Sequence, residues 1–139
     1  MWAFRMSDAQ TPKILVIEVD AELRANLLDL LDAEALIGFG AANGAHGFAL
    51  AVEHVPDVIL CDVTTRDLDD FGLCTRLRDC SDTAHIPLIF ISAHAEQAAL
   101  DRERGLCGGS AHLTKPFALA DVLSMIASRV AHADDQHMP

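Results

Sequence analysis

The sequence lacks several features that mark specific classes of protein. It has no apolar run approaching the roughly 18 residues of a membrane-spanning helix, and its first residues lack the long apolar segment of a secretion signal. It also has no internal repeat, no low-complexity segment and no interdomain linker. We therefore expect a cytoplasmic protein with one domain, which is ordinary for a chain of 139 residues.

Basic residues are scarce. Lys and Arg total 10 against 21 Asp and Glu, which gives a formal net charge of −11. A surface with this charge repels both the nucleic-acid backbone and anionic lipid headgroups. We therefore expect neither direct binding to nucleic acid nor binding to a membrane.

Cysteine is present, but without the spacing of a disulfide framework or a metal site. The four cysteines are Cys61, Cys74, Cys80 and Cys107. None of them forms a C-x-x-C pair, and a domain that is 51% apolar can bury a core without cross-links. We expect all four to be reduced thiols and none to bind a metal.

What the sequence does contain is an alternation of short apolar runs with helical periods. We predict strands near 13–19, 38–42, 58–61, 88–91 and 111–114, and helices near 21–34, 45–54, 71–78, 95–104 and 119–130. Asp20 is placed to be the N-cap of the first helix. Near-continuous apolar strands separated by helices are typical of a parallel sheet covered on both faces, so the predicted fold is α/β, a (βα)5 doubly wound five-stranded sheet. Residues 1–12 are expected to be a leader, 13–131 the domain and 132–139 a frayed tail.

Polar side chains follow four of the predicted strands. Glu18 and Asp20 end the first strand, Asp62 the third and Ser92 the fourth, and Lys115 follows the fifth. In an open parallel sheet the carboxyl ends of the strands form one edge, where active groups gather. We expect carboxylates, a hydroxyl and an amine to converge there, with Asp62 as the candidate reactive carboxylate.

Four ordered motifs in the chain resemble the receiver domains of two-component response regulators, which have a flavodoxin-like fold. The motifs are KILVIEVD at 13–20, PDVILCD at 56–62, PLIFISAH at 87–94 and LTKPF at 113–117. Each motif alone is weak, but the four occur in the family's order and at compatible intervals. The resemblance covers about residues 13–131.

The resemblance implies roles for individual residues. Asp62 would be the phosphoacceptor and Ser92 the hydroxyl that contacts the phosphoryl group. Lys115 would contact the same group from a turn with a cis bond to Pro116, and His112 would be the switch residue that changes rotamer. The family's cofactor is Mg2+, a hard ion that takes oxygen ligands. Its ligands here would be Glu18, Asp62 and the backbone carbonyl of Thr64.

One position departs from the family pattern. Receivers usually carry two adjacent acids after the first strand, whereas Val19 follows Glu18 in this chain. Asp20 could contribute to the metal site through a water, although it is also the expected helix cap. Because Mg2+ tolerates a shell of water ligands, we expect its binding to be weakened.

These observations leave three interpretations. The first is a stand-alone receiver that takes a phosphoryl group from a histidine kinase or phosphotransfer protein and signals to a downstream protein. Its output face would comprise helix 95–104, strand 111–114 and the last helix, with a homodimer through these helices left open. The second is a degenerate receiver, a binding module that acts without Mg2+. The third is an enzyme, a haloacid-dehalogenase-like phosphatase, which normally carries a second acid where Thr64 stands. A flavin site is disfavoured because the acidic turn would repel the cofactor's phosphate.

Overall fold

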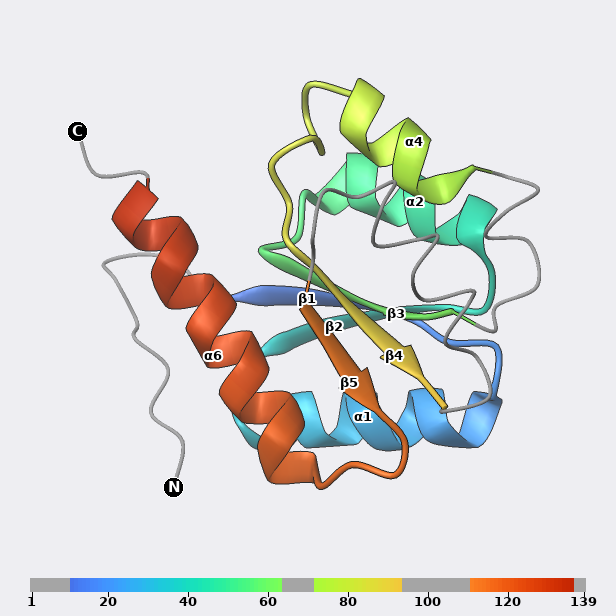
Figure 1. Ribbon diagram of the computed structural model, residues 1–139, viewed down its shortest axis with the longest axis vertical. Helices are drawn as coiled ribbons and strands as arrows, with labels where there is room; N and C mark the ends of the chain where they lie inside the picture. Colours follow the sequence, from blue (N-terminus) through green and yellow to red (C-terminus); the bar gives the residue numbers. More distant parts are fainter. Residues whose placement is uncertain (1–10, 64–71, 94–110, 137–139) are drawn as a thin grey trace.

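The chain is organised around one five-stranded β-sheet with helices on both faces (Figure 1). The computed structural model describes residues 11–63, 72–93 and 111–136, with side chains described as far as residue 130. In chain order the elements are β1 (Lys13–Ile17), α1 (Ala21–Ala33), β2 (Ile37–Ala41), α2 (Gly44–His54), β3 (Val58–Asp62), α4 (Leu73–Asp79), β4 (Leu88–Ser92), β5 (Ala111–Thr114) and α6 (Leu119–Gln136).

The strand order of the sheet is β2-β1-β3-β4-β5, and every neighbouring pair is parallel. This arrangement confirms the predicted doubly wound parallel sheet. It places β3, the strand that carries Asp62, in the centre of the sheet, flanked by β1 and β4. The predicted helix 95–104 lies outside the described residues.

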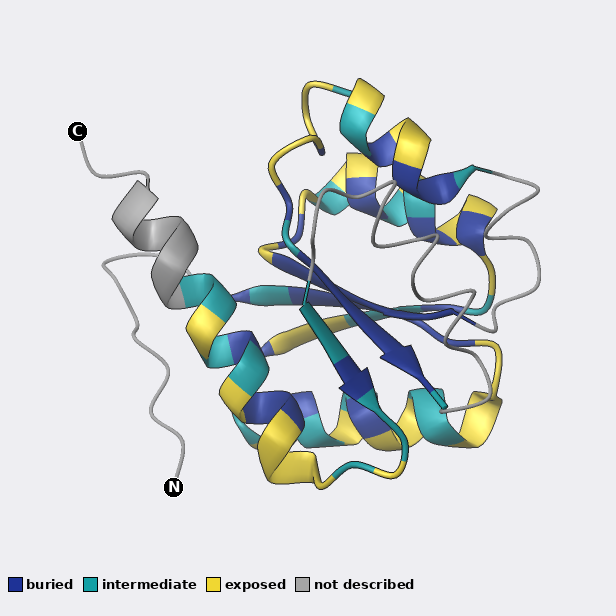
Figure 2. Cartoon of the chain, in the orientation of Figure 1, coloured by how far each residue is buried: buried dark blue, intermediate teal, exposed yellow. Residues whose placement is uncertain are grey.

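The apolar core has two layers, one on each face of the sheet. Alternate residues of a strand point to opposite faces, so that Leu15 and Ile17 of β1 pack toward α2 and α4, whereas Ile14 and Val16 pack toward α1 and α6. Figure 1 shows these two pairs of helices on opposite sides of the sheet, and Figure 2 shows that the central strands are buried. Complete burial of one such side chain stabilises the fold by about 1.5–3 kcal/mol.

Asp20 begins α1 as predicted. Its backbone is extended, and its side-chain Oδ1 accepts hydrogen bonds from the N–H groups of Glu22 at 2.9 Å and Leu23 at 3.2 Å. These two amides have no partner within the helix, which is why an acidic or hydroxyl side chain stabilises this position. The cap fixes where the chain turns from the end of β1 into α1.

Two expectations about the chain are wrong. The last helix was expected to end near residue 130, but α6 continues to Gln136, so the predicted tail starts too early. All four cysteines were expected to be reduced, but Cys74 is disulfide-bonded, whereas Cys61 and Cys80 are free. Spacing along the chain cannot reveal such a bond, because it depends on which segments the fold brings together.

Candidate functional site

The carboxyl ends of β3, β4 and β5 lie side by side. In the parallel register Asp62 pairs with Ile91, and Ser92 pairs with Thr114. The backbone N–H of Lys115 donates to the carbonyl of Ser92 at 2.7 Å, which ties the segment after β5 to the end of β4. The fold therefore brings Asp62, Ser92 and Lys115 to one edge of the sheet.

Asp62 and Lys115 form an ion pair in this edge. The Nζ of Lys115 lies 2.8 Å from Oδ2 of Asp62, and the two residues are 53 positions apart in the sequence. Asp62 is completely buried, and the side chain of Lys115 is 32% exposed. A carboxylate removed from water needs a cation or several hydrogen bonds, and the ammonium provides one such partner.

Two further features concern residues that the sequence singled out. The peptide bond between Lys115 and Pro116 is cis, as the resemblance implied. Ser92 is the last residue of β4 and is 2% exposed, so a hydroxyl is present inside the edge and not on the surface.

Glu18 follows β1 and is also buried, with 1% of its surface exposed. Its Oε2 accepts a hydrogen bond from the backbone N–H of Asp20 at 3.0 Å, while its Oε1 has no hydrogen-bond partner. Burial, together with the nearby carboxyl of Asp62, raises the pKa of Glu18 from 4.5 to about 7. A hydrogen bond between the two carboxyl groups requires a proton. When both groups are ionised, two buried negative charges therefore face each other.

This pair of carboxyl groups fits a hard cation. A divalent ion bound between Glu18 and Asp62 would provide the partner that Oε1 lacks and would offset both the burial of the Glu18 charge and its repulsion by Asp62, which raise the pKa of Glu18. Within the described ranges no cluster of three or more His, Cys, Asp or Glu side chains is placed to hold a metal. Protein carboxylates would thus supply only part of an octahedral shell, which suits Mg2+ because it commonly keeps several waters.

The other residues predicted for the site are not buried beside Asp62 in the described part of the chain. Asp20 is exposed, and its Oδ1 is used as the cap of α1. Val19 is 48% exposed, so its substitution by an acid would not disturb the core. His112 is half-buried in the middle of β5, opposite Phe90 of β4. Thr64 lies outside the described residues.

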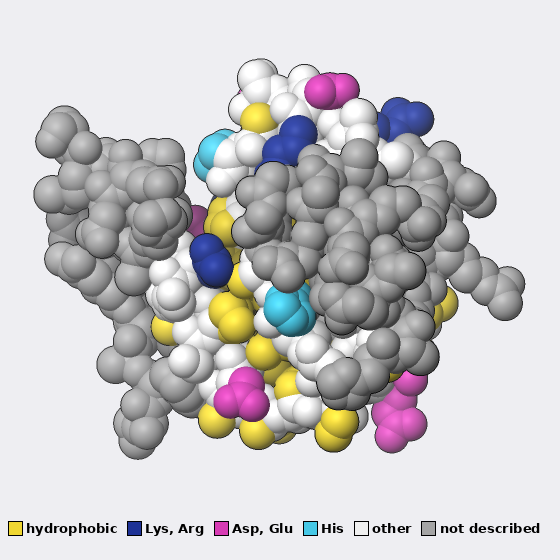
Figure 3. Space-filling model, viewed as in Figure 1, with side chains coloured by type: hydrophobic (Ala, Val, Ile, Leu, Met, Phe, Trp, Pro, Cys, Tyr) yellow, Lys and Arg dark blue, Asp and Glu magenta, His cyan; other side chains and the backbone are white. Residues whose placement is uncertain are grey.

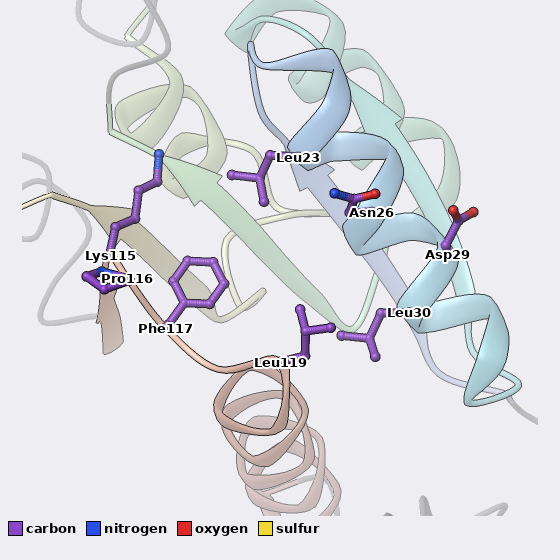
Figure 4. Close-up of a pocket in the computed structure, with 8 residues that line it drawn as sticks. All are labelled: Leu23, Asn26, Asp29, Leu30, Lys115, Pro116, Phe117 and Leu119. Carbon is purple, nitrogen blue, oxygen red and sulfur yellow. The ribbon is translucent and has the colours of Figure 1, made fainter.

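Sequence reasoning missed a pocket beside the ion pair. It has a volume of about 610 Å3 and lies between α1 and the segment that joins β5 to α6 (Figure 4). Leu23 and Leu30 line it from α1, whereas Lys115, Phe117 and Leu119 line it from the other side. The apolar helical period of α1 was visible in the sequence, but the opposite wall of the pocket comes from residues about 90 positions later in the chain, and no local pattern shows that the two segments meet.

The arginine of α1 was also missed. Nη1 of Arg24 donates to the backbone carbonyl of Glu18 at 2.7 Å. No motif marked Arg24, because a contact from an arginine to a main-chain carbonyl requires no particular partner side chain.

The profile of the response regulator receiver domain matches residues 14–127. The chain is 39% identical over 107 residues to response regulator PleD of Caulobacter vibrioides, an alignment that covers 76% of this chain but only 23% of PleD. It is 32% identical over 124 residues to the polar-differentiation response regulator DivK of Brucella anthropi, covering 88% of this chain and 99% of DivK.

Solved structures show the same fold. A CheY-like receiver domain protein from Methanospirillum hungatei superimposes with a TM-score of 0.80 at 17% identity, over 91% of this chain and 99% of that one. Chemotaxis protein CheY4 of Vibrio cholerae superimposes with a TM-score of 0.76 at 22% identity, over 87% and 99%. Among the described helices, none is both long and apolar enough to cross a membrane. The profile match and the shared fold together place the chain in the family of response regulator receiver domains.

Proposed function

We propose that this receiver domain accepts a phosphoryl group on Asp62 from a histidine kinase or a phosphotransfer protein, and that it signals through contacts with other proteins. The observation that carries the proposal is the environment of Asp62. This carboxylate is completely buried at the centre of the sheet edge, paired with Lys115 at 2.8 Å and adjacent to the carboxyl of Glu18. Titratable groups gathered at the carboxyl ends of parallel strands are typical of functional sites.

The proposed step is a phosphoryl transfer between two side chains. A carboxylate oxygen of Asp62 attacks the phosphorus of a phosphohistidine, the P–N bond breaks, and the electron pair leaves with the imidazole of the donor. The product is an acyl phosphate on Asp62. Lys115 already lies beside this carboxylate, so its ammonium is placed to neutralise a phosphoryl oxygen. The Ser92 hydroxyl would hydrogen-bond to another oxygen.

Mg2+ is the proposed cofactor. Glu18 and Asp62 would hold it through carboxylate oxygens, with the backbone carbonyl of Thr64 as a further ligand expected from the family. When bound, Mg2+ supplies positive charge that stabilises the phosphoryl oxygens during transfer. The orphan Oε1 of Glu18 supports this assignment, because a buried carboxylate oxygen without a donor is a ready ligand.

The pocket beside Lys115 supports docking of the donor protein. It opens between α1 and the start of α6, and Figure 4 shows Lys115 at its edge with Leu23 across from it. Apolar side chains gather on the surface over this region in Figure 3. A helix of the donor that packed into the pocket would bring its phosphohistidine near Asp62.

The output of the domain is proposed to depend on Ser92 and His112. Phosphorylation would draw the Ser92 hydroxyl toward the phosphoryl group, and the half-buried ring of His112 on the neighbouring strand would follow. The face around β5 and α6 would then present a changed surface to a downstream protein, or to a second copy of the chain. The predicted helix of this face lies outside the described residues. A cytoplasmic location stays a prediction.

A degenerate receiver is the second candidate, and one observation favours it. Asp20, the only acid near Glu18 in the acidic turn, uses Oδ1 to cap α1 and is therefore less available to a metal. With Val19 in place of the second acid, the buried carboxylates among the described residues of the site are those of Glu18 and Asp62. A module of this kind would bind partners in one conformation without Mg2+.

Incubation with phosphoramidate and Mg2+, followed by intact-mass spectrometry, separates the two candidates. The proposal expects the wild type to gain the mass of one phosphoryl group, and expects Asp62→Asn to gain none. Asp57→Asn is the matched control, because it removes an exposed aspartate at the other end of the same sheet, and it should label normally. Labelling abolished by chelation supports the metal role, whereas an unlabelled wild type would favour the degenerate module.

We propose that the chain is not an enzyme, in keeping with the signalling role typical of its family. A haloacid-dehalogenase-like phosphatase would hydrolyse small phosphate esters repeatedly. Assay with an aryl phosphate and Mg2+ should therefore show no turnover beyond the rate in buffer. Sustained turnover that disappears in Asp62→Asn would revive the phosphatase interpretation.

A further inference from the structure

Arg24 links the first part of α1 to the end of β1. Its Nη1 donates to the backbone carbonyl of Glu18 over 2.7 Å, in a partly buried position. A guanidinium is planar and always charged, so it forms a strong and directional hydrogen bond with a carbonyl oxygen. The contact is made to the residue whose side chain faces Asp62.

A glycine provides the room for this contact. A Cβ added at Gly40 of β2 would lie 2.9 Å from Cδ1 of Leu28 and 3.3 Å from Cδ of Arg24. The apolar stem of Arg24 therefore passes close over Gly40, and α1 lies near enough to β2 for the guanidinium to reach back to β1. The stem is confined, which limits the rotamers of the arginine.

Glu18 is thus fixed at three points. Its N–H donates to the carbonyl of Ala41 at 2.9 Å, its carbonyl accepts from Arg24, and its Oε2 accepts from the N–H of Asp20 at 3.0 Å. Only Oε1 has no partner. These contacts set the position from which Oε1 can reach a cation shared with Asp62.

We propose that Arg24 is a positioning residue for the Glu18 carboxylate and thereby strengthens Mg2+ binding. This inference rests on the proposed function, in which Glu18 and Asp62 hold the ion. Because Val19 supplies no second acid, the affinity of the site depends more heavily on the placement of Glu18. Groups that orient metal ligands commonly change metal affinity by about 10–100-fold when they are removed.

The charge of Arg24 alone predicts the opposite effect. A fixed cation near the site repels Mg2+, so its removal would tighten binding if Arg24 acted only through its charge. If Arg24 acts by positioning Glu18, its removal weakens binding. The sign of the change in affinity therefore distinguishes the two roles.

The test compares Arg24→Met with Lys13→Met. Methionine keeps an unbranched apolar stem and removes the donor. Lys13 is a matched control, because its Nζ also donates to a backbone carbonyl, that of His54 at 3.3 Å, at the amino end of the sheet. Titration calorimetry with Mg2+ at constant ionic strength should show affinity lowered by on the order of 10-fold in Arg24→Met and unchanged in Lys13→Met. Arg24→Lys, which keeps a charged donor, should recover part of the loss.

A second measurement needs no metal. Amide hydrogen exchange in the chelated protein reports on the Asp20 N–H, which is bonded to the Glu18 side chain. Its exchange should be faster in Arg24→Met than in wild type, and unchanged in Lys13→Met. Equal or tighter Mg2+ binding by Arg24→Met overturns the inference.

If the wild type binds no Mg2+, the proposed phosphoacceptor function fails instead. The exchange rate of the Asp20 amide then decides whether Arg24 positions Glu18. An Asp20 amide that exchanges faster in Arg24→Met supports the positioning role, and an unchanged rate overturns it. Circular dichroism of each variant shows whether it folds. If Arg24→Met does not fold, the same measurements are made on Arg24→Lys.

Discussion

The two ends of the sheet carry the same pair of residue types in different surroundings. At the amino end Asp57 accepts the N–H of Lys13 through Oδ2 at 2.8 Å, and its own N–H donates to the Lys13 carbonyl at 2.7 Å. At the carboxyl end Asp62 pairs with the ammonium of Lys115. Both pairs join segments that are distant in the sequence.

The two pairs differ in how far their aspartates are buried. Asp57 is exposed, and both of its contacts are to backbone groups of Lys13, so that pair aligns the starts of β1 and β3. Asp62 is completely buried beside a second buried carboxyl, Glu18, one of whose oxygens has no partner. An aspartate beside a lysine therefore has a structural role where water and backbone groups satisfy its hydrogen-bonding capacity. It becomes a candidate reactive group where carboxyl groups face each other out of water.

Removal of the Lys115 ammonium should have the largest effect on stability. Lys115→Met removes the ammonium that lies 2.8 Å from the buried carboxylate of Asp62. We expect a loss of about 2–4 kcal/mol in the free energy of unfolding at pH 8, somewhat less than for an ion pair in which both side chains are fully buried. Urea denaturation without metal measures this change.

The partner substitution is the control. Asp62→Asn removes one of two neighbouring carboxyl groups and leaves the ammonium of Lys115, whose side chain is 32% exposed. It should cost less than about 1 kcal/mol or stabilise the protein, since it relieves the repulsion of Glu18. Equal losses in both variants would show that the pair acts like an ordinary ion pair.

The second prediction concerns the pH dependence of the metal-free protein. The pKa of Glu18 is raised from 4.5 to about 7 in the folded state. The folded protein therefore binds this proton more tightly than the unfolded chain. Protonation of Glu18 thus favours folding at low pH, and the contribution is lost as pH rises from about 4.5 to about 7. We expect a change on the order of 3 kcal/mol across this range.

Glu18→Gln isolates this effect. Glutamine resembles the protonated side chain at every pH, so the variant should become progressively more stable than wild type up to about pH 7, with a constant difference above it. Urea denaturation at several pH values in the presence of a chelator measures the difference. A difference independent of pH would mean that the two carboxyl groups do not interact in the folded protein.

Local patterns in the sequence were sufficient for much of this structure. The apolar runs predicted the strands, because strands buried on both faces are near-continuous apolar runs. The residue type of Asp20 before a helical period predicted its cap, and parallel topology then placed Asp62 and Lys115 at one edge. Each step used residues close in sequence or a general rule of α/β folds.

The remaining features depend on tertiary contacts. The pairing of Arg24 with the Glu18 carbonyl follows from the close approach of α1 to β2 over Gly40. The raised pKa of Glu18 follows from burial next to Asp62. The disulfide at Cys74 likewise leaves no local pattern, and α6 continues to Gln136, beyond the apolar helical period that ends at Val130.

The third prediction concerns a substitution that restores the second acid of the family pattern. Val19→Asp should tighten Mg2+ binding by roughly 1–3 kcal/mol, the scale of a charge-assisted contact. Because Val19 is 48% exposed, the substitution removes little buried apolar surface and should leave the fold intact. Titration calorimetry measures the affinity. An unchanged affinity would mean that the missing acid does not limit the metal site.

The smallest effect is expected at the amino end. Asp57→Asn keeps an oxygen that can accept the N–H of Lys13 and removes only an exposed charge. We expect a loss below about 1 kcal/mol in the free energy of unfolding, with no dependence on Mg2+, because exposed charges contribute little. Urea denaturation with and without Mg2+ measures both quantities. A loss as large as that of Lys115→Met would show that the exposed pair at the starts of the strands contributes as much to stability as the buried pair at their ends. The proposed difference between the two pairs would then be wrong.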